Sequence, residues 1–258
     1  MRNYRNPICG AFAAAAFIFI AGCGGSGSGY GGTPPPPMQT PPTITLAALP
    51  AGSVHRTVPL TATPTAAAGV SRVEFLLDDA VIGTVTTAPY TFNWDTSAVA
   101  NGPHNLSARV TDAANAVATT AAVTVNVNNN PVIHVVLSPD EVIPKPVSTA
   151  TGEGDVTVNL LDGSVTGGVT VSGITATLAH IHDAFAGSAG PVIVNFVQSG
   201  TDPNRWDAEA GAILTADQIN DLLAGKLYVN VHSAAYPQGE IRGQLKPENL
   251  YGDRKSVV

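Results

Sequence analysis

The chain has 258 residues, of which 44% are hydrophobic and 12% are charged, and its formal net charge is −7. This length allows one large domain or two of ordinary size. The acidic balance and the lack of a basic run argue against a nucleic-acid partner, because phosphate binding needs clustered lysine and arginine. Valine, threonine, alanine, glycine and proline dominate, which favours strands and turns over long helices.

Residues 1–22 have the pattern of a signal peptide. Arg2 and Arg5 precede an apolar run at 11–20 that is too short to span a bilayer as a lasting helix. The run continues into Ala21-Gly22-Cys23, which resembles the cleavage site of a bacterial lipoprotein. This resemblance implies cleavage before Cys23, a lipid on that cysteine and attachment of the protein to a membrane. No aspartate follows the cysteine, so we expect the protein to lie at the outer membrane or the cell surface, or in the periplasm.

The mature chain would contain no free thiol, because the other cysteine, Cys9, leaves with the signal peptide. Any transition metal must then be held by nitrogen or oxygen ligands. Residues 23–42 are rich in glycine and serine and then in proline, so they should form a flexible, partly extended linker.

Residues 43–128 predict a β-sandwich. Val73, Phe75 and Leu77 alternate with polar residues, and turn residues separate further short runs of the same period. The passage from Val73 to His104 also resembles bacterial immunoglobulin-like (Ig-like) domains. That resemblance implies a spacer or adhesive module.

Residues 132–246 predict a second all-β domain after a polar break at 128–131. We expect an antiparallel barrel or sandwich with one short helix, which begins with a capping box at Thr215 and ends at Gly225. Residues 247–258 are expected to form a frayed tail. The predicted strands include 133–137, 155–161, 164–174, 178–182, 191–197, 226–232 and 240–245.

Two of these strands carry histidines on their polar faces. In a strand, successive side chains alternate between faces, so His180 and His182 project together. In the second strand Tyr228, Asn230 and His232 share a face. The three histidines therefore form a candidate metal site, and neutral imidazole suits copper and zinc better than magnesium or calcium.

The same strands carry a family resemblance. His180-Ile181-His182, the strand 227–233 and Gly239-Glu240-Ile241-Arg242-Gly243-Gln244 resemble the chordin-type (CHRD) domain. The similarity covers about residues 133–245. Asp183 departs from the glycine that commonly follows the second histidine. The family name alone does not supply a function.

The arrangement of the candidate site is similar to that of copper/zinc superoxide dismutases. This resemblance implies that His180, His182 and His232 hold copper and that Arg242 attracts superoxide as a catalytic residue. Copper would oxidise one superoxide and reduce the next. No zinc subsite is apparent, so copper alone is expected, with zinc as the alternative metal. His134, Asp183 and water are the alternatives for a fourth ligand. Strand alternation places His134 and Arg242 on the outward, polar faces of their own strands.

Two other functions fit the same residues. The protein would be a non-catalytic surface module that recognises a protein or glycan, or a periplasmic protein that stores or delivers copper. The sequence leaves catalysis, storage and adhesion open, because substrate access depends on the three-dimensional structure.

Overall fold

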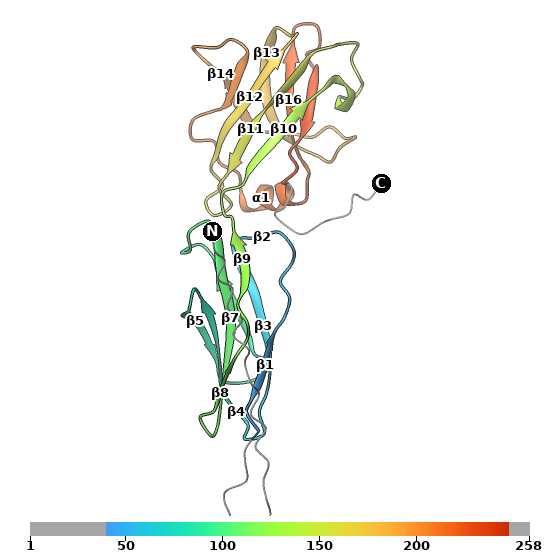
Figure 1. The fold of residues 1–258 in the computed structure, drawn as a ribbon. Helices are drawn as coiled ribbons and strands as arrows, with labels where there is room; N and C mark the ends of the chain where they lie inside the picture. The colour runs from blue at the N-terminus through green and yellow to red at the C-terminus, as the bar shows by residue number, and fades with distance from the viewer. Residues whose placement is uncertain (1–39, 248–258) are drawn as a thin grey trace, which may run out of the picture. The chain divides into compact units, whose positions relative to one another are not determined.

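The computed structural model describes residues 40–247 (Figure 1). The predicted signal peptide, the predicted lipidation site Cys23, most of the linker and nearly all of the tail lie outside the described residues. No helix in the described range is long and apolar enough to cross a membrane. The two expected all-β domains are present, each with its own core. We call them the sandwich domain (43–127) and the barrel domain (132–245).

The sandwich domain contains two sheets, with strand orders β1-β3-β6 and β2-β9-β7-β4-β5, and β8 pairs with β7. Its strands are β1 (Thr43–Leu46), β2 (Ser53–Val54), β3 (Thr57–Thr65), β4 (Val70–Leu77), β5 (Ala80–Val85), β6 (Thr91–Asp95), β7 (Gly102–Asp112), β8 (Val117–Thr119) and β9 (Val123–Val127).

The predicted core residues of β4 are confirmed, but the strand is not half-buried, because Glu74 and Leu76 between them are buried as well. Val73, Phe75 and Leu77 are all buried in the core. Asp78 and Asp79 then form the two-residue turn into β5 with φ angles of 48° and 66°. Positive φ at both positions matches the natural twist of a tight hairpin, and aspartate tolerates it better than most residues.

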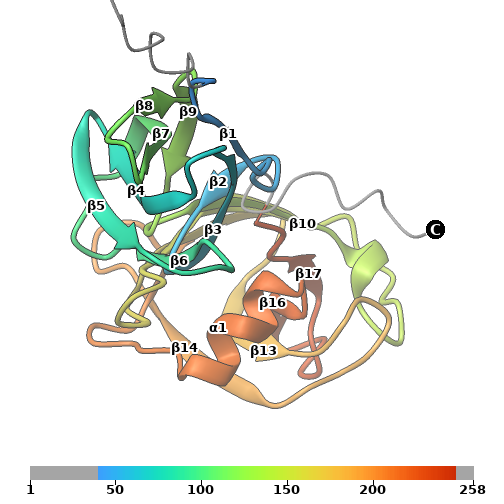
Figure 2. The same ribbon diagram turned by 90° about the horizontal axis from the view of Figure 1, so that it is seen from below.

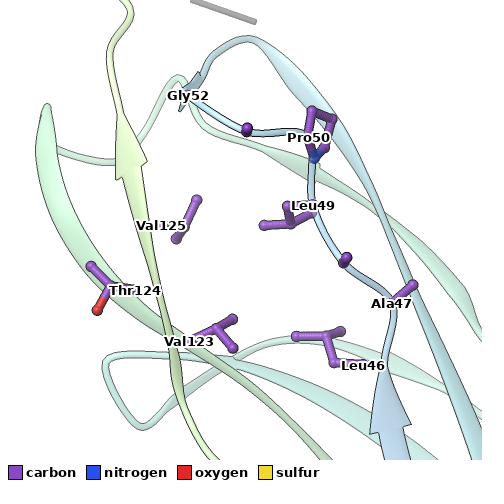
Figure 3. Close-up of a pocket in the computed structure, with 10 residues that line it drawn as sticks. Leu46, Ala47, Leu49, Pro50, Gly52, Val123, Thr124 and Val125 are labelled. Carbon is purple, nitrogen blue, oxygen red and sulfur yellow. The ribbon is translucent and has the colours of Figure 1, made fainter. Parts of the chain in front are cut away.

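A hollow of about 450 Å³ lies where the chain leaves one sheet of the sandwich for the other. β1 pairs with β3, whereas β2 pairs with β9 in the second sheet. Segment 46–52 makes this crossing and stands off from Val123, Thr124 and Val125 (Figure 3). The hollow is therefore a consequence of the change of sheet.

The barrel domain is an eight-stranded antiparallel sheet with strand order β10-β11-β12-β15-β14-β13-β16-β17. Its elements are β10 (Val132–Leu137), the short 3-10 helix η1 (Pro139–Glu141), β11 (Thr151–Val158), β12 (Val165–Ser172), β13 (Ala176–Asp183), β14 (Val192–Gln198), β15 (Arg205–Ala208), α1 (Ala216–Leu223), β16 (Leu227–Ser233) and β17 (Ile241–Gln244). The sequence did not predict β15, and it placed the start of β11 four residues late.

The two outermost strands of this sheet meet and nearly close it. Ser138, just after β10, and Arg242 in β17 exchange backbone hydrogen bonds of 2.9 and 3.0 Å. The inward side chains of all eight strands then form one apolar core. Closure leaves few free strand edges, which limits pairing with other chains.

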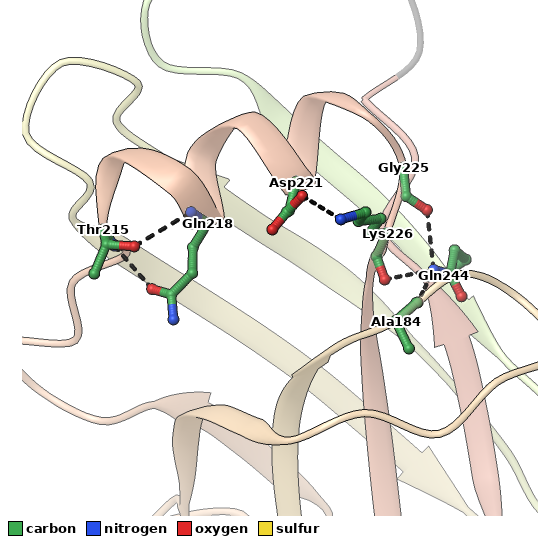
Figure 4. Close-up of polar contacts among 7 residues, drawn as sticks. All are labelled: Ala184, Thr215, Gln218, Asp221, Gly225, Lys226 and Gln244. Carbon is green, nitrogen blue, oxygen red and sulfur yellow. Dashed lines mark hydrogen bonds and ion pairs between the residues drawn. The ribbon is translucent and has the colours of Figure 1, made fainter.

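The predicted helix is confirmed as α1. Thr215 accepts a hydrogen bond from the Gln218 backbone N–H, and the Gln218 side chain accepts one from the Thr215 backbone (Figure 4). Ile219 and Leu222 pack into the barrel core. The helix lies across one end of the barrel (Figures 1 and 2).

Gly168 should be essential to the close approach of β12 and β15. A Cβ atom there would lie 2.0 Å from the Trp206 carbonyl oxygen and 2.6 Å from the Asp207 Cα. Because both neighbours are backbone atoms, we expect Gly168→Ala to lower the free energy of unfolding by about 2 kcal/mol, as overpacking does. Chemical denaturation measures this. Gly200→Ala is the matched control, since a Cβ at that position would meet no atom within 4 Å, and equal stability of the two variants would contradict the prediction.

Candidate metal centre

The three candidate histidines come from two neighbouring strands. β13 lies between β14 and β16, and His180 stands opposite Asn230 of β16. His182 is two residues further along the same face, opposite Tyr228. His232 is the diagonal neighbour of His180, which is within reach of side chains of this size.

This geometry brings the three rings together. The ring centroids of His180 and His232 are 5.1 Å apart, those of His180 and His182 5.7 Å, and those of His182 and His232 6.1 Å. One ring nitrogen of each residue lies within 4.8 Å of those of the other two. We call these residues the His triad.

Backbone carbonyls fix the orientation of two rings. His182 Nδ1 donates to the Gly190 carbonyl at 2.9 Å, and His232 Nδ1 donates to the Pro237 carbonyl at 3.0 Å. A carbonyl oxygen has no proton to give, so both histidines carry theirs on Nδ1. In the neutral rings Nε2 is then the free lone pair.

The two Nε2 atoms differ in what they contact. His232 Nε2 lies 3.2 Å from His180 Nδ1, which donates to it. His182 Nε2 is buried and has no hydrogen-bond partner in the described part of the chain. Buried polar atoms are usually satisfied, and the lone pair of this one remains available to a ligand.

The triad is held in the neutral form. Burial lowers the pKa of His180 to about 4, with further lowering by His232 and His182. Burial also lowers the pKa of His182, aided by the charge of Arg242, and that of His232, aided by His182. Neutral imidazole is the form that binds metal.

The polar face of β16 is itself buried. His182 and His232 are only 8% and 7% exposed, and Asn230 is 6% exposed. Only His180 is half-buried. Two loops supply the ring-orienting carbonyls: residues 184–191, which join β13 to β14 and contain Gly190, and residues 234–240, which join β16 to β17 and contain Pro237. The sequence suggested a polar surface, whereas the structure has a recessed site with one partly open side.

Arg242 lies on the predicted face, opposite Asn230 in the neighbouring strand. It is 3% exposed, and its guanidinium lies 3.4 Å from the centre of the Tyr228 ring. His182 stacks on the same ring, with centroids 5.0 Å apart and an interplanar angle of 8°. Because β16 lies between β13 and β17, His182 and Arg242 approach the ring from opposite sides. The guanidinium is thus separated from the triad by one aromatic ring.

The structure does not bring His134 or Asp183 into the triad. His134 does face outward as its parity predicted, but it lies on β10 and pairs with Asp155 at 2.9 Å. Asp183 interacts with Asp221 and Lys226. The pKa of its carboxyl is raised, mainly by burial and secondly by the nearby Asp221.

The carbonyls of Gly190 and Pro237 are the groups that sequence reasoning missed. Each lies in a loop, and a backbone carbonyl has no residue type that would reveal it. Tyr228 was recognised as a member of the polar face, but not as a stacking partner of His182. With three nitrogen donors so arranged, the His triad could hold a metal ion.

The metal-free protein should lose stability as the pH falls from 6.5 towards 4. Folding lowers the pKa of His180 from 6.5 to about 4, so the unfolded chain binds its proton first. This contribution is complete above pH 6.5 and is lost progressively below it. Unfolding measured against pH should show a smaller loss over this range for His180→Gln. A His180 ring that titrates near pH 6.5 by NMR would contradict the assignment.

Comparison with protein-family models agrees with the two folds. Residues 133–245 match the model of the CHRD domain, and residues 42–108 match that of a bacterial Ig domain. Among solved structures, the chain is similar to a fibronectin(III)-like module of Clostridium thermocellum CbhA, at 30% identity and a TM-score of 0.30, covering 33% of this chain and 97% of that one. No curated protein matches the chain. The chain thus carries a bacterial Ig-like domain followed by a CHRD domain.

Proposed function

We propose that the CHRD domain binds a transition metal through His180, His182 and His232, with copper the first expectation and zinc the second. The observation that carries this proposal is the buried His182 Nε2, which has no partner among the described residues. Its lone pair belongs to a ring whose other nitrogen is anchored on a backbone carbonyl. Metal-binding histidines typically have this second hydrogen bond.

The donor set supports copper or zinc over harder metals. Three neutral imidazoles provide nitrogen, and the sequence from Gly24 onward has no cysteine to add a thiolate. Three protein ligands leave a coordination position for water or substrate. His232 already offers the lone pair of its Nε2 to a metal. His180 would offer the lone pair of Nδ1 once the proton on this atom moves to the Nε2 of the same ring.

A bound copper would supply one-electron redox chemistry. The resemblance of the site to that of copper/zinc superoxide dismutases implies copper-only dismutation of superoxide. Storage or delivery of copper uses the same ligands without turnover. Superoxide removal by the copper-loaded protein separates them: catalysis requires turnover, and storage predicts binding alone. Protein that stays metal-free under copper-replete conditions would instead favour an adhesion module that recognises a protein or glycan.

We further infer that the domain works outside the cytoplasm. The pattern that supports this is the signal-like segment ending at Cys23, followed by the Gly/Ser/Pro-rich linker and the Ig-like domain. A lipid on Cys23 would hold the CHRD domain at a membrane, with the linker as spacer.

The lipid-free chain from residue 24 onward should bind one copper ion. We expect His182→Ala to lower the affinity for copper by at least tenfold, because it removes one of the three proposed ligands. Titration with Cu(II) against a chelator measures it. His134→Ala is the matched control, because this histidine is exposed and paired with Asp155. Equal affinities of the His182→Ala variant and the parent would contradict the site.

Replacement of Cys23 should release the protein from the membrane. Cys23→Ser removes the thiol that would carry the lipid, so the chain should move from the membrane fraction to the soluble fraction. Fractionation and labelling with a radioactive fatty acid follow the change. Membrane attachment of Cys23→Ser equal to that of the parent would rule out this anchor.

A further inference from the structure

Arg242 has no contact with the His triad, yet it holds the loop that orients His182. We propose that Arg242 is a positioning residue: its guanidinium fixes the 184–191 loop so that the Gly190 carbonyl keeps His182 in its metal-binding tautomer. The consequence for metal affinity rests on the proposed function. The consequence for the tautomer of His182 does not.

The guanidinium forms a fork between β17 and the loop. Nη1 donates to the Ser188 carbonyl at 2.7 Å, and Nη2 donates to the Phe185 carbonyl at 3.1 Å. Nη2 also contacts Gln244 Oε1 at 3.2 Å. The planar arginine head presents donors in a fixed geometry, and two carbonyls of one short loop match it.

Gln244 holds the start of the same loop. Its Nε2 contacts the carbonyls of Ala184, Gly225 and Lys226 at 2.8–3.0 Å (Figure 4). Arg242 and Gln244 are both buried, at 3% and 7% exposure. Two residues on the same face of β17 therefore hold the loop by hydrogen bonds between Ala184 and Ser188.

Tyr228 connects the loop held by Arg242 and Gln244 to the ring of His182. Its hydroxyl accepts a hydrogen bond from the Gly190 N–H at 3.1 Å, while the Gly190 carbonyl accepts from His182 Nδ1 at 2.9 Å. The Tyr228 ring lies between the guanidinium and the imidazole. Gly190 is also tightly enclosed, since a Cβ there would lie 2.0 Å from the Asp183 carbonyl oxygen.

The burial of Arg242 favours this role over the attraction of an anion from solvent. A guanidinium that is 3% exposed and bonded to two loop carbonyls contributes its geometry more than its charge. Lysine keeps the charge but offers a compact ammonium that cannot reproduce the fork. The Arg242→Lys variant therefore separates the two roles.

The experiment uses the full chain in detergent, stripped of metal and titrated with Cu(II) and with Zn(II) against a chelator. We expect Arg242→Lys to weaken metal binding ten- to a hundredfold, the range typical of residues that support a ligand. In the metal-free Arg242→Lys variant, nitrogen NMR should show that the His182 ring no longer populates the Nδ1–H tautomer alone. Arg205→Lys is the control and should change neither reading, because Arg205 is a half-buried arginine of β15 that pairs with Asp207.

Wild-type affinity and a wild-type His182 tautomer in Arg242→Lys would overturn the proposal. If Arg242→Lys does not fold, Tyr228→Phe replaces it, because it removes only the hydroxyl that anchors Gly190. We then expect a smaller loss in the same two readings, and wild-type values in both would overturn the proposal. A parent protein that binds neither metal would refute the proposed function, while the tautomer reading would still test Arg242.

Discussion

The burial of β16 on both faces is the constraint on which the barrel domain depends. Leu227, Val229 and Val231 lie in the apolar core, while the other face carries Asn230 and His232 under two loops. A buried polar face is costly unless its groups are hydrogen-bonded. The loops satisfy most of these groups through their backbone, so the shape of the loops and the orientation of the histidines are set by the same bonds.

Much of this domain could be predicted from period-two alternation. Alternation identified the inward and outward residues of β10, β13, β16 and β17, including the common face of the His triad. It gives the side of a strand but not its position around a barrel. His134 therefore faces outward as predicted, yet it lies on β10 and pairs with Asp155 on the adjacent strand.

The remaining features depend on contacts that leave no pattern in the sequence. β15 is a short strand, Arg205–Ala208, that completes the sheet by pairing with β12 and β14. Gly152 and Gly154 interrupt the alternation of β11, so its start was placed too late. Residues 183–190 and 233–239 fall between predicted strands, but whether these loops cover a polar face depends on where the barrel brings them.

The buried His182 Nε2 connects the fold to the proposed function. A buried polar atom left without a partner costs roughly 1–3 kcal/mol, and the stacked Tyr228 and the Gly190 carbonyl prevent the ring from turning away to find one. The metal-free domain thus retains a cost that a ligand on Nε2 would remove. A ring held in this way loses little further freedom when it binds, because the fold has already restricted it. The rigidity of the loops and the affinity of the site then have one physical origin, which is the dense hydrogen bonding of the face shared by β13, β16 and β17.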